Sequence, residues 1–367
     1  MTDNFWLLEF AEHASKTDKF TDKSDHVALL AAGLIGEAGS IVAELKKKRR
    51  ERDAYPAYRE KMVEELGDFL WYFVRLTAVS APRLLQELSG PNKTLLSAEG
   101  GSQLSEHLEF GAAVGEVLAA VSASRHGDLN MLLRRVWVLL MRTANDAGVC
   151  LANAAVRNKE KIQSRWPEEK HYVPLFDDVF PMEEQLPRHL QVDFLERASG
   201  SHRTVILRCN EINFGDRLTD NIVDPDGYRF HDIFHFAYVV YLGWSPVVRA
   251  LMRSKRKSDA KVDEVQDGAR ARIIEEAVSA IIFSRAKQLN FFEGLDRVDL
   301  ELLKTVKEFV AGFEVEIAPL WQWETAILNG YRVFRALCAG SGGRVTLDMG
   351  SRQLIYQPLS LGSDRAM

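Results

Sequence analysis

Two helical segments near the N-terminus carry carboxylates on faces that are otherwise apolar, and this pattern restricts the fold more than any other feature. The acids are Glu37 and Glu44 in the first segment and Glu64, Glu65 and Asp68 in the second. Residues three, four or seven positions apart share a helix face, so acids within a segment align. Acids are rarely buried unless they are paired or bind a metal. The pattern therefore predicts two packed helices whose oxygen-only cluster suits a hard cation such as Mg²⁺.

Helical periodicity extends over most of residues 3–166. The predicted helices are Phe5–Lys16, Asp25–Arg50, Ala57–Val79, Gln103–Ser124 and Leu129–Ser164. Pro82 and the Gly- and Pro-containing stretch 89–101 interrupt the pattern, and Pro167 ends it. Helices joined partly by short loops are typical of a bundle, so an all-α domain is predicted over residues 1–167.

The character of the chain changes after Pro167. Residues 168–190 are rich in proline and acids, which predicts a linker. β-Branched and alternating residues then predict strands at Gln191–Arg197 and Arg203–Ile212, and a hairpin formed by Arg344–Met349 and Arg352–Gln357. Helices are expected at Tyr228–Ser254, Ala269–Leu289 and Leu300–Gly340. The whole chain is thus predicted to be mainly α, with an α+β domain, mostly helical with a small antiparallel sheet, over residues 191–367.

Composition restricts the class of protein further. The chain has 46% hydrophobic and 27% charged residues and a net charge of -5, which argues against a nucleic-acid-binding coat. We expect no membrane segment, because no uninterrupted apolar run approaches the ~18–20 residues of a span. The first ten residues carry acids where a signal peptide carries basic residues. Three widely spaced cysteines fit a reducing compartment, so a cytoplasmic location is expected.

The acidic segments, GLIGEAGS…AELKK and EELGDFLWY, resemble the MazG-like all-α nucleoside triphosphate pyrophosphohydrolases. The motif of that family is Glu-x-x-Glu on one helix and Glu-x-x-Asp on the next. A later signature, Asn-x-x-Lys-x-x-x-Arg, is present as Asn158, Lys161 and Arg165. The matches occur in order over residues ~5–167, and the second half resembles, less specifically, a C-terminal domain that accompanies some MazG-like proteins.

The resemblance implies an enzyme that uses Mg²⁺, with Mn²⁺ as a substitute, to hydrolyse NTPs or dNTPs to NMP and pyrophosphate. It also implies a homodimer or homotetramer. Such an activity removes aberrant nucleotides or depletes the nucleotide pool, including during phage infection. The implied metal ligands are Glu37, Glu44, Glu65 and Asp68, and the implied catalytic residues are Glu37, Glu64, Glu65 and Asp68. Either Glu64 or Glu44 would accept the proton of the attacking water.

One position departs from the family pattern. Ser40 stands where the second Glu of the first motif is usual. Glu44, one helical turn further on, is expected to supply the missing carboxylate. Ser40 is expected to line the site or to bind the metal through its hydroxyl or a water.

A basic face is expected to bind the substrate. Asn158, Lys161 and Arg165 fall at i, i+3 and i+7 of one helix, so they share a face. Cations there would meet the charge of a triphosphate. Lys47, in the basic run after Glu44, is the best candidate of that run for a further phosphate contact.

The second half contains a separate polar motif. His231 and His235 lie four positions apart on a predicted helix, with Asp232 between them, and a later helix carries Glu275 and Glu276. This spacing can bind one metal ion, but histidine pairs of this kind are more often structural and cap a core polar network or line an interface. A nearby basic run is expected to lie in solvent or to bind an anion: Arg253, Lys255, Arg256 and Lys257.

Two further functions remain open at this point. A catalytically weakened nucleotide-binding regulator would explain Ser40, and it predicts binding without turnover. A phosphohydrolase centred on His231 and His235 would place the chemistry in the second half, with the helical domain as an oligomeriser.

Overall fold

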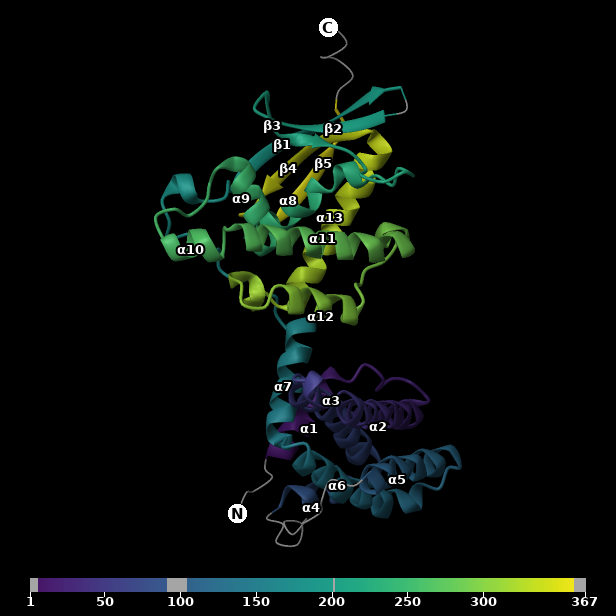
Figure 1. Cartoon of the computed structure of the whole chain (residues 1–367). Coiled ribbons are helices and arrows are strands. Elements are labelled where there is room, and N and C mark those ends of the chain that lie inside the picture. Colours follow the sequence, from purple (N-terminus) through teal and green to yellow (C-terminus); the bar gives the residue numbers. More distant parts are fainter. Residues whose placement is uncertain (1–5, 91–103, 201, 360–367) are drawn as a thin grey trace. The chain divides into compact units, whose positions relative to one another are not determined.

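The computed structural model describes residues 6–90, 104–200 and 202–359. The chain divides into two compact units, Met1–Pro167 and Glu168–Met367, each with its own hydrophobic core. Figure 1 labels their elements. Helices dominate both units, and the strands form one small antiparallel sheet in unit 2. The predicted fold class, mainly α with a small sheet, is confirmed.

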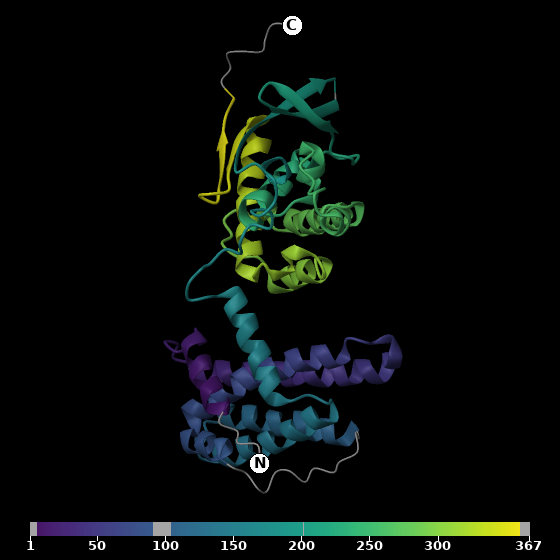
Figure 2. The same ribbon diagram turned by 90° about the vertical axis from the view of Figure 1, so that its left-hand side faces the viewer.

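Unit 1 is a helical bundle. Its helices are α1 (Trp6–Thr17), α2 (His26–Glu51), α3 (Tyr58–Ser80), α4 (Pro82–Ser89), α5 (Leu104–Ser122), α6 (Leu129–Asp146) and α7 (Leu151–Arg165). The long helices α2 and α3 lie side by side (Figure 2). Helix α3 also contacts α1, α6 and α7, so it forms the centre of the bundle. Leu34 of α2 and Phe69 and Phe73 of α3 are fully buried, and Trp71 is nearly so.

The predicted helix Leu129–Ser164 is wrong, because the structure divides it into α6 and α7. Gly148 has φ +66°, a left-handed conformation in which glycine has no Cβ to clash. The Val149 N–H then donates to the Ala144 carbonyl at 2.8 Å, which closes the end of α6. Helix α4 forms directly after the predicted break at Pro82. Most of the break expected at 89–101 lies outside the described residues.

The segment His26–Ala54, which contains α2, has the length and composition to cross a membrane. Glu37 interrupts the apolar run of this stretch, so the sequence pattern did not predict a span here. Leu30, Leu34 and Ile41 of this segment are nonetheless fully buried, and α2 packs against α3 and α5. A core helix of a bundle passes the same test of length and apolarity.

The sheet of unit 2 has the order β3-β2-β1-β4-β5, with antiparallel neighbours throughout. Its strands are β1 (His189–Ser199), β2 (His202–Cys209), β3 (Ile212–Leu218), β4 (Gly342–Asp348) and β5 (Gln353–Gln357). Strands were expected in all these places except β3. That strand alternates poorly, since Asn213, Asp216 and Arg217 give it a polar and largely exposed pattern.

The helices of unit 2 pack beside the sheet. They are α8 (Asp232–Leu242), α9 (Pro246–Met252), α10 (Ala260–Val265), α11 (Ala269–Gln288), α12 (Leu300–Phe309) and α13 (Leu320–Gly340). Every residue of α8 is buried, and α13 lies against it. Two predicted helices, Tyr228–Ser254 and Leu300–Gly340, are each divided in the structure. Gly243 ends α8 with φ +66°, and Gly312, with φ +83°, and Pro319 lie between α12 and α13.

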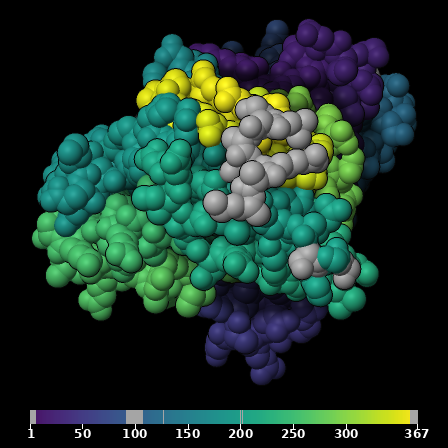
Figure 3. Space-filling model, turned by 90° about the horizontal axis from the view of Figure 1, so that it is seen from above, coloured from purple at the N-terminus to yellow at the C-terminus, as the bar shows by residue number. Residues whose placement is uncertain are grey.

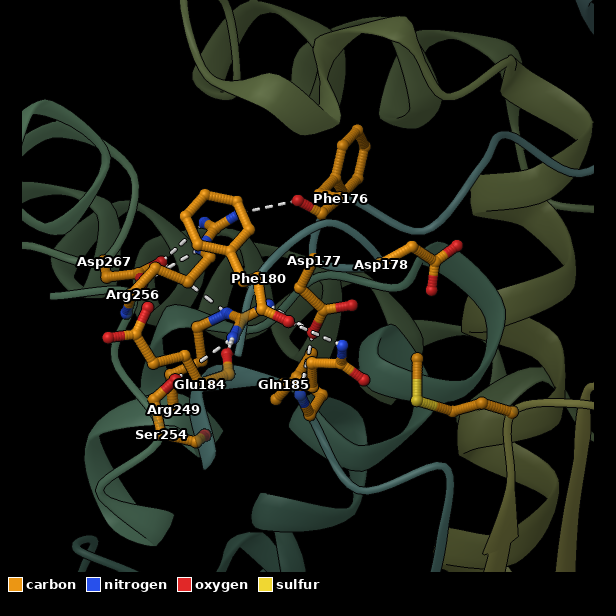
Figure 4. Close-up of polar contacts among 12 residues, drawn as sticks. Phe176, Asp177, Asp178, Phe180, Glu184, Gln185, Arg249, Ser254, Arg256 and Asp267 are labelled. Atoms are coloured by element: carbon orange, nitrogen blue, oxygen red, sulfur yellow. Dashed lines mark hydrogen bonds and ion pairs between the residues drawn. The ribbon is translucent and has the colours of Figure 1, made fainter. Parts of the chain in front are cut away.

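Residues 168–188 of the expected linker 168–190 pack into unit 2, and its last two residues begin β1. Its Asp177 lies 2.7 Å from Arg249 of α9 and accepts a hydrogen bond from the Leu186 N–H (Figure 4). Glu184 accepts a hydrogen bond from the Ser258 N–H at 2.9 Å. In the space-filling view the segment, in dark teal, lies against green residues of this region (Figure 3). It is therefore part of the second unit.

The basic run after α9 is not solvated as a whole, because Arg256 is 1% exposed. Its guanidinium lies 2.6 Å from Asp267 and donates to the Phe176 carbonyl (Figure 4). It also lies 2.7 Å from Glu314. We refer to Asp177, Arg249, Arg256, Asp267 and Glu314 as the buried arginine network. Arg256 therefore anchors the fold and is unavailable to an external anion, which corrects the expectation for this residue.

Candidate functional site

Tyr72 of α3 marks the place where the carboxylates of α2 and α3 approach each other. Gly33 of α2 makes room for its ring, since a Cβ at position 33 would lie 2.1 Å from Tyr72 Cε1. Burial raises the pKa of the Tyr72 hydroxyl, and the negative charges of Glu37 and Asp68 raise it further. Glu37 and Asp68 therefore lie within electrostatic reach of one hydroxyl group.

Asp68 is held by two residues of α7. Asn158 Nδ2 donates to Asp68 Oδ1 at 2.6 Å, and Lys161 Nζ bonds both carboxylate oxygens of Asp68. Lys161 Nζ also lies 3.9 Å from Glu64 Oε1. We call these four residues the Asp68 cluster. The structure thus brings together four residues that the sequence assigned to the site.

A second glycine sets the distance between α3 and α7. A Cβ at Gly67 would lie 2.6 Å from the Ala154 carbonyl oxygen and 3.0 Å from Asn158 Cβ. Only glycine permits this approach, so Gly67 places Asn158 against the neighbouring Asp68. Asn158 is 5% exposed, and its buried Oδ1 has no hydrogen-bond partner among the described residues. A buried amide oxygen of this kind is costly unless a ligand or water satisfies it.

A cavity of about 220 Å³ lies beside the Asp68 cluster. Its walls are formed by Glu60, Val63, Glu64, Asp68, Arg157, Asn158 and Lys161. Carboxylates from α3 face cations from α7 across it, so it can accept both a metal ion and an anionic group. Arg157 was missed by the sequence analysis, although it lies four positions before Lys161 and so on the same face.

Glu44 lies at a second point of contact between the helices. The Tyr55 hydroxyl donates to Glu44 Oε2, and Lys47 Nζ lies 4.0 Å from the Tyr55 ring centroid. Burial raises the pKa of Tyr55, as do the hydrogen bond to Glu44 and the charge of Glu65. Tyr55 was also missed by the sequence analysis. It connects Glu44 and Lys47 and lies within reach of Glu65.

The predicted metal ligands of unit 1 are not gathered around one point. Among the described residues, no three of Glu37, Glu44, Glu65 and Asp68 place ligand atoms within 4.8 Å of one another. All four are partly exposed, and Lys161 neutralises Asp68. Ser40 lies half-buried on α2 between Glu37 and Glu44. Mutual repulsion keeps like charges apart until a cation offsets it.

Arg165 differs from Lys161 in its surroundings. It is 7% exposed, and its guanidinium lies 5.6 Å from the centroid of the Trp166 ring. It does not line the cavity beside the Asp68 cluster. The shared helix face therefore brings Asn158 and Lys161 to Asp68 but leaves Arg165 near the end of α7.

Unit 2 contains the second predicted cluster. Ligand atoms of His231, Asp232 and His235 all lie within 4.8 Å of one another, and the three residues are buried. The two imidazole rings are 5.9 Å apart between centroids. The Glu275 carboxylate contacts His235 Nδ1 at 2.7 Å, and Glu276 Oε1 lies 3.5 Å from His235 Nε2. The structure thus brings together all five residues that the sequence proposed for this site.

The two histidines differ in protonation. Burial lowers the pKa of His231, despite the nearby carboxylate of Asp232. Burial also disfavours the charged form of His235, but Glu275 and Glu276 outweigh it and raise the pKa well above its ordinary value. The contacts with His235 and the charge of His231 lower the pKa of Glu276 despite burial.

Comparison with known families identifies the second unit. The family model of the MazG C-terminal domain matches residues 171–360, which is more than half of the chain. The chain belongs to the MazG C-terminal domain family. The match begins inside the segment 168–188, in agreement with its packing into unit 2. Searches of curated proteins and of solved structures gave no significant match.

Membership in this family places the cluster of α8 and α11 inside the MazG C-terminal domain. The Asp68 cluster lies outside the matched residues. The MazG-like character of unit 1 therefore stays a prediction from its motifs.

Proposed function

We propose that unit 1 is a Mg²⁺-dependent pyrophosphohydrolase that converts NTPs or dNTPs to NMP and pyrophosphate. The observation that carries this proposal is the Asp68 cluster, in which Asn158 and Lys161 of α7 hold a carboxylate of α3 beside a cavity. A MazG-related protein, as the C-terminal family match indicates, is consistent with such an activity.

The donor set of unit 1 fits Mg²⁺ in its chemistry. Glu37, Glu44, Glu65 and Asp68 offer only oxygen, all are partly exposed, and they lie on two helices in contact. These residues would hold the ion. Lys161 Nζ lies beside Asp68 and supplies the positive charge that this carboxylate would otherwise need from a cation. When bound, Mg²⁺ neutralises phosphate oxygens and lowers the pKa of the attacking water.

The residues around the cavity have separate roles in binding the substrate and in transferring a proton. Lys161 and Arg157 supply positive charge for the triphosphate, and this charge grows in importance as negative charge moves to the leaving pyrophosphate. Asn158 Oδ1 accepts a hydrogen bond from a substrate hydroxyl or amino group. Glu64 accepts the proton of the water that attacks the α-phosphorus, while the bond from that phosphorus to the bridging oxygen breaks.

A nucleotide-binding regulator is the second candidate. It is favoured by Ser40, which stands in the place of an acid, and by the separation of the carboxylates in unit 1. Such a protein would use Lys161 and Arg157 to bind a triphosphate but would lack the metal geometry for turnover. Binding and turnover therefore have to be measured side by side.

The deciding experiment is a panel of NTPs and dNTPs incubated with the full chain and Mg²⁺, with the products separated by anion exchange. Asp68→Ala should lower turnover at least about 100-fold, since even the partners of metal ligands are worth about 10–100-fold. Asp53→Ala is the control, because Asp53 is an exposed acid of the same unit. It should retain the activity of the unaltered chain.

Each result selects one function. NMP with pyrophosphate, lost in Asp68→Ala and retained in Asp53→Ala, supports the pyrophosphohydrolase. Nucleotide binding without product supports the regulator. Release of inorganic phosphate that persists in Asp68→Ala contradicts both and moves the chemistry to the cluster of His231 and His235.

A further inference from the structure

The hydrogen bonds of His231 and His235 fix which ring nitrogen of each is available. His231 Nδ1 lies 2.9 Å from the Tyr228 carbonyl oxygen. A carbonyl only accepts hydrogen bonds, so Nδ1 carries the proton and Nε2 is left for another partner. His235 Nδ1 lies 2.7 Å from Glu275 Oε1 and donates to it in the same manner. In both rings, Nε2 is therefore the nitrogen that is available to bind a ligand.

Glu275 is itself held in place. Its carboxylate accepts hydrogen bonds from Ser245 Oγ at 2.6 Å and from the Val247 N–H at 2.8 Å, in addition to the one from His235. The side chain of Glu275 is fully buried. Three donors leave its oxygens little freedom. A carboxylate that orients a histidine through Nδ1 is the usual outer partner of a metal-bound imidazole.

The two Nε2 atoms face carboxylates across a small space. His231 Nε2 lies 3.3 Å from Asp232 Oδ1, and His235 Nε2 lies 3.5 Å from Glu276 Oε1. His235 is fully buried, and its Nε2 has no hydrogen-bond partner among the described residues. Two oriented nitrogens with one buried and one partly exposed carboxylate are a donor set for a cation.

We propose that His231, Asp232 and His235 of the MazG C-terminal domain bind a divalent transition-metal ion, with Glu276 as a further oxygen ligand. Mixed imidazole and carboxylate donors suit Zn²⁺, Fe²⁺ or Mn²⁺, whereas Mg²⁺ prefers oxygen alone. This site is independent of the carboxylates in unit 1. Neither the family match nor the proposed pyrophosphohydrolase activity assigns it.

The site has a route to solvent through Glu276. The side chain of Glu276 is 46% exposed, and it lines a cavity of about 580 Å³ between α9 and α11. Arg272, one turn earlier on α11, lines the same cavity. An ion could enter along this side, and a small anion drawn by Arg272 could reach it.

One alternative uses the same atoms without a metal. The raised pKa of His235 allows an imidazolium to lie between Glu275 and Glu276 and to satisfy both. In that case a proton replaces the metal, and the cluster is structural. Metal content separates these two arrangements, because only the first needs an ion to be bound by the folded chain.

The test uses the untagged full chain, stripped with EDTA and titrated with Zn²⁺ or Mn²⁺. Bound metal is measured by elemental analysis after gel filtration, and folding by circular dichroism. We expect one strongly held ion per chain. His231→Gln and Asp232→Asn should weaken binding at least about 100-fold, and Glu275→Gln about 10–100-fold through loss of its hold on His235. His202→Gln, an exposed histidine of the same unit, is the matched control.

Loss of the ion in His231→Gln and Asp232→Asn, with retention in His202→Gln, would support the site. Retention in Asp68→Ala would then place the ion in unit 2, whatever the fate of the pyrophosphohydrolase activity. The proposal is overturned if the folded chain holds no ion. Equal retention by all variants, or loss only in Asp68→Ala, overturns it as well. Co²⁺ offers a second readout, since its visible spectrum should change in His231→Gln.

Discussion

The Asp68 cluster of unit 1 and the buried arginine network of unit 2 are both groups of opposite charges, but their surroundings differ. In the first, the side chains of Lys161 and Asp68 are 21% and 20% exposed and line a cavity. In the second, those of Arg256 and Asp267 are 1% and 0% exposed. Each charged member of the network has an opposite charge within 2.7 Å.

The difference separates a charge cluster that holds structure from one that can bind. A buried ion pair repays its desolvation only when geometry and further hydrogen bonds are good, and it cannot exchange partners cheaply. The Asp68 cluster is partly exposed, and Asn158 Oδ1 remains to be satisfied. Lys161 can therefore exchange its ion pair with Asp68 for one with a phosphate at a small cost in free energy. Exposure and unmet hydrogen-bonding capacity, rather than the number of charges, distinguish the two.

The largest expected effect is in the arginine network. Asp267→Ala leaves Arg256 with Glu314 alone and removes a neighbour of Arg249, whose guanidinium is 3.6 Å away. Breaking a buried pair by removing one partner costs about 3–5 kcal/mol. Urea unfolding followed by tryptophan fluorescence should show this loss in unit 2.

The matched control is Asp193→Ala, which removes a pair with Arg344 that lies on the exposed side of the sheet. Surface pairs contribute about 0–1 kcal/mol. If both variants lower the free energy of unfolding equally, burial does not explain the difference between the clusters.

A smaller effect is expected from the spacing of α3 and α7. Gly67→Ala would place a Cβ 2.6 Å from the Ala154 carbonyl oxygen, so α7 must move and carry Asn158 and Lys161 away from Asp68. We expect turnover to fall about 10-fold or more, because small displacements of positioning groups are costly. The measurement is the rate of pyrophosphate release under Mg²⁺.

Gly39→Ala provides the control, since a Cβ at Gly39 would have no atom within 4 Å. It should keep full activity and stabilise α2 by up to about 1 kcal/mol. Full activity in Gly67→Ala would contradict the role given to helix spacing.

The smallest effect concerns acid stability. Burial alone would raise the pKa of Asp177, but Arg188, the Leu186 N–H and Arg249 together hold it below its ordinary value of 3.8. A depressed folded pKa adds stability above the unfolded value, and that stability is lost as the pH falls through the folded pKa. Unit 2 should therefore lose stability below about pH 4. Thermal melts between pH 7 and pH 3 test this, and Asp177→Asn should show a shallower dependence.

Much of the fold could be predicted because local patterns decide it. The ends of α2, α3 and α11 lie within about two residues of those expected, since amphipathic runs and breakers coincide there. The divisions at Gly148 and Gly243 were missed, because periodicity continues on both sides of each glycine. Left-handed φ values there depend on how the next helix packs. Strand β3 was missed since a polar edge strand carries little hydrophobic signal.

The candidate sites also contain parts that local sequence patterns predict and parts that depend on the packing of distant segments. Asp68 and Lys161 were assigned to one site by the family resemblance, and His235 and Glu275 were assigned to another by the expected packing of two helices. Arg256 was misjudged because its partners, Asp267 and Glu314, are distant in sequence and only the fold brings them together. Whether Glu37, Glu44 and Glu65 converge on one ion stays a prediction, because a cation would itself contribute to gathering them.

The central position of β1 has a consequence for how the chain is made. It pairs with β2, its neighbour in sequence, and with β4, close to the C-terminus, so that Leu190 meets Leu347. The α2–α3 pair needs no such distant partner, so unit 1 can fold while the rest is still being synthesised. Until β4 leaves the ribosome, one edge of β1 stays open to other chains. A truncation that removes β4 and β5 would therefore produce aggregation while leaving every proposed ligand in place.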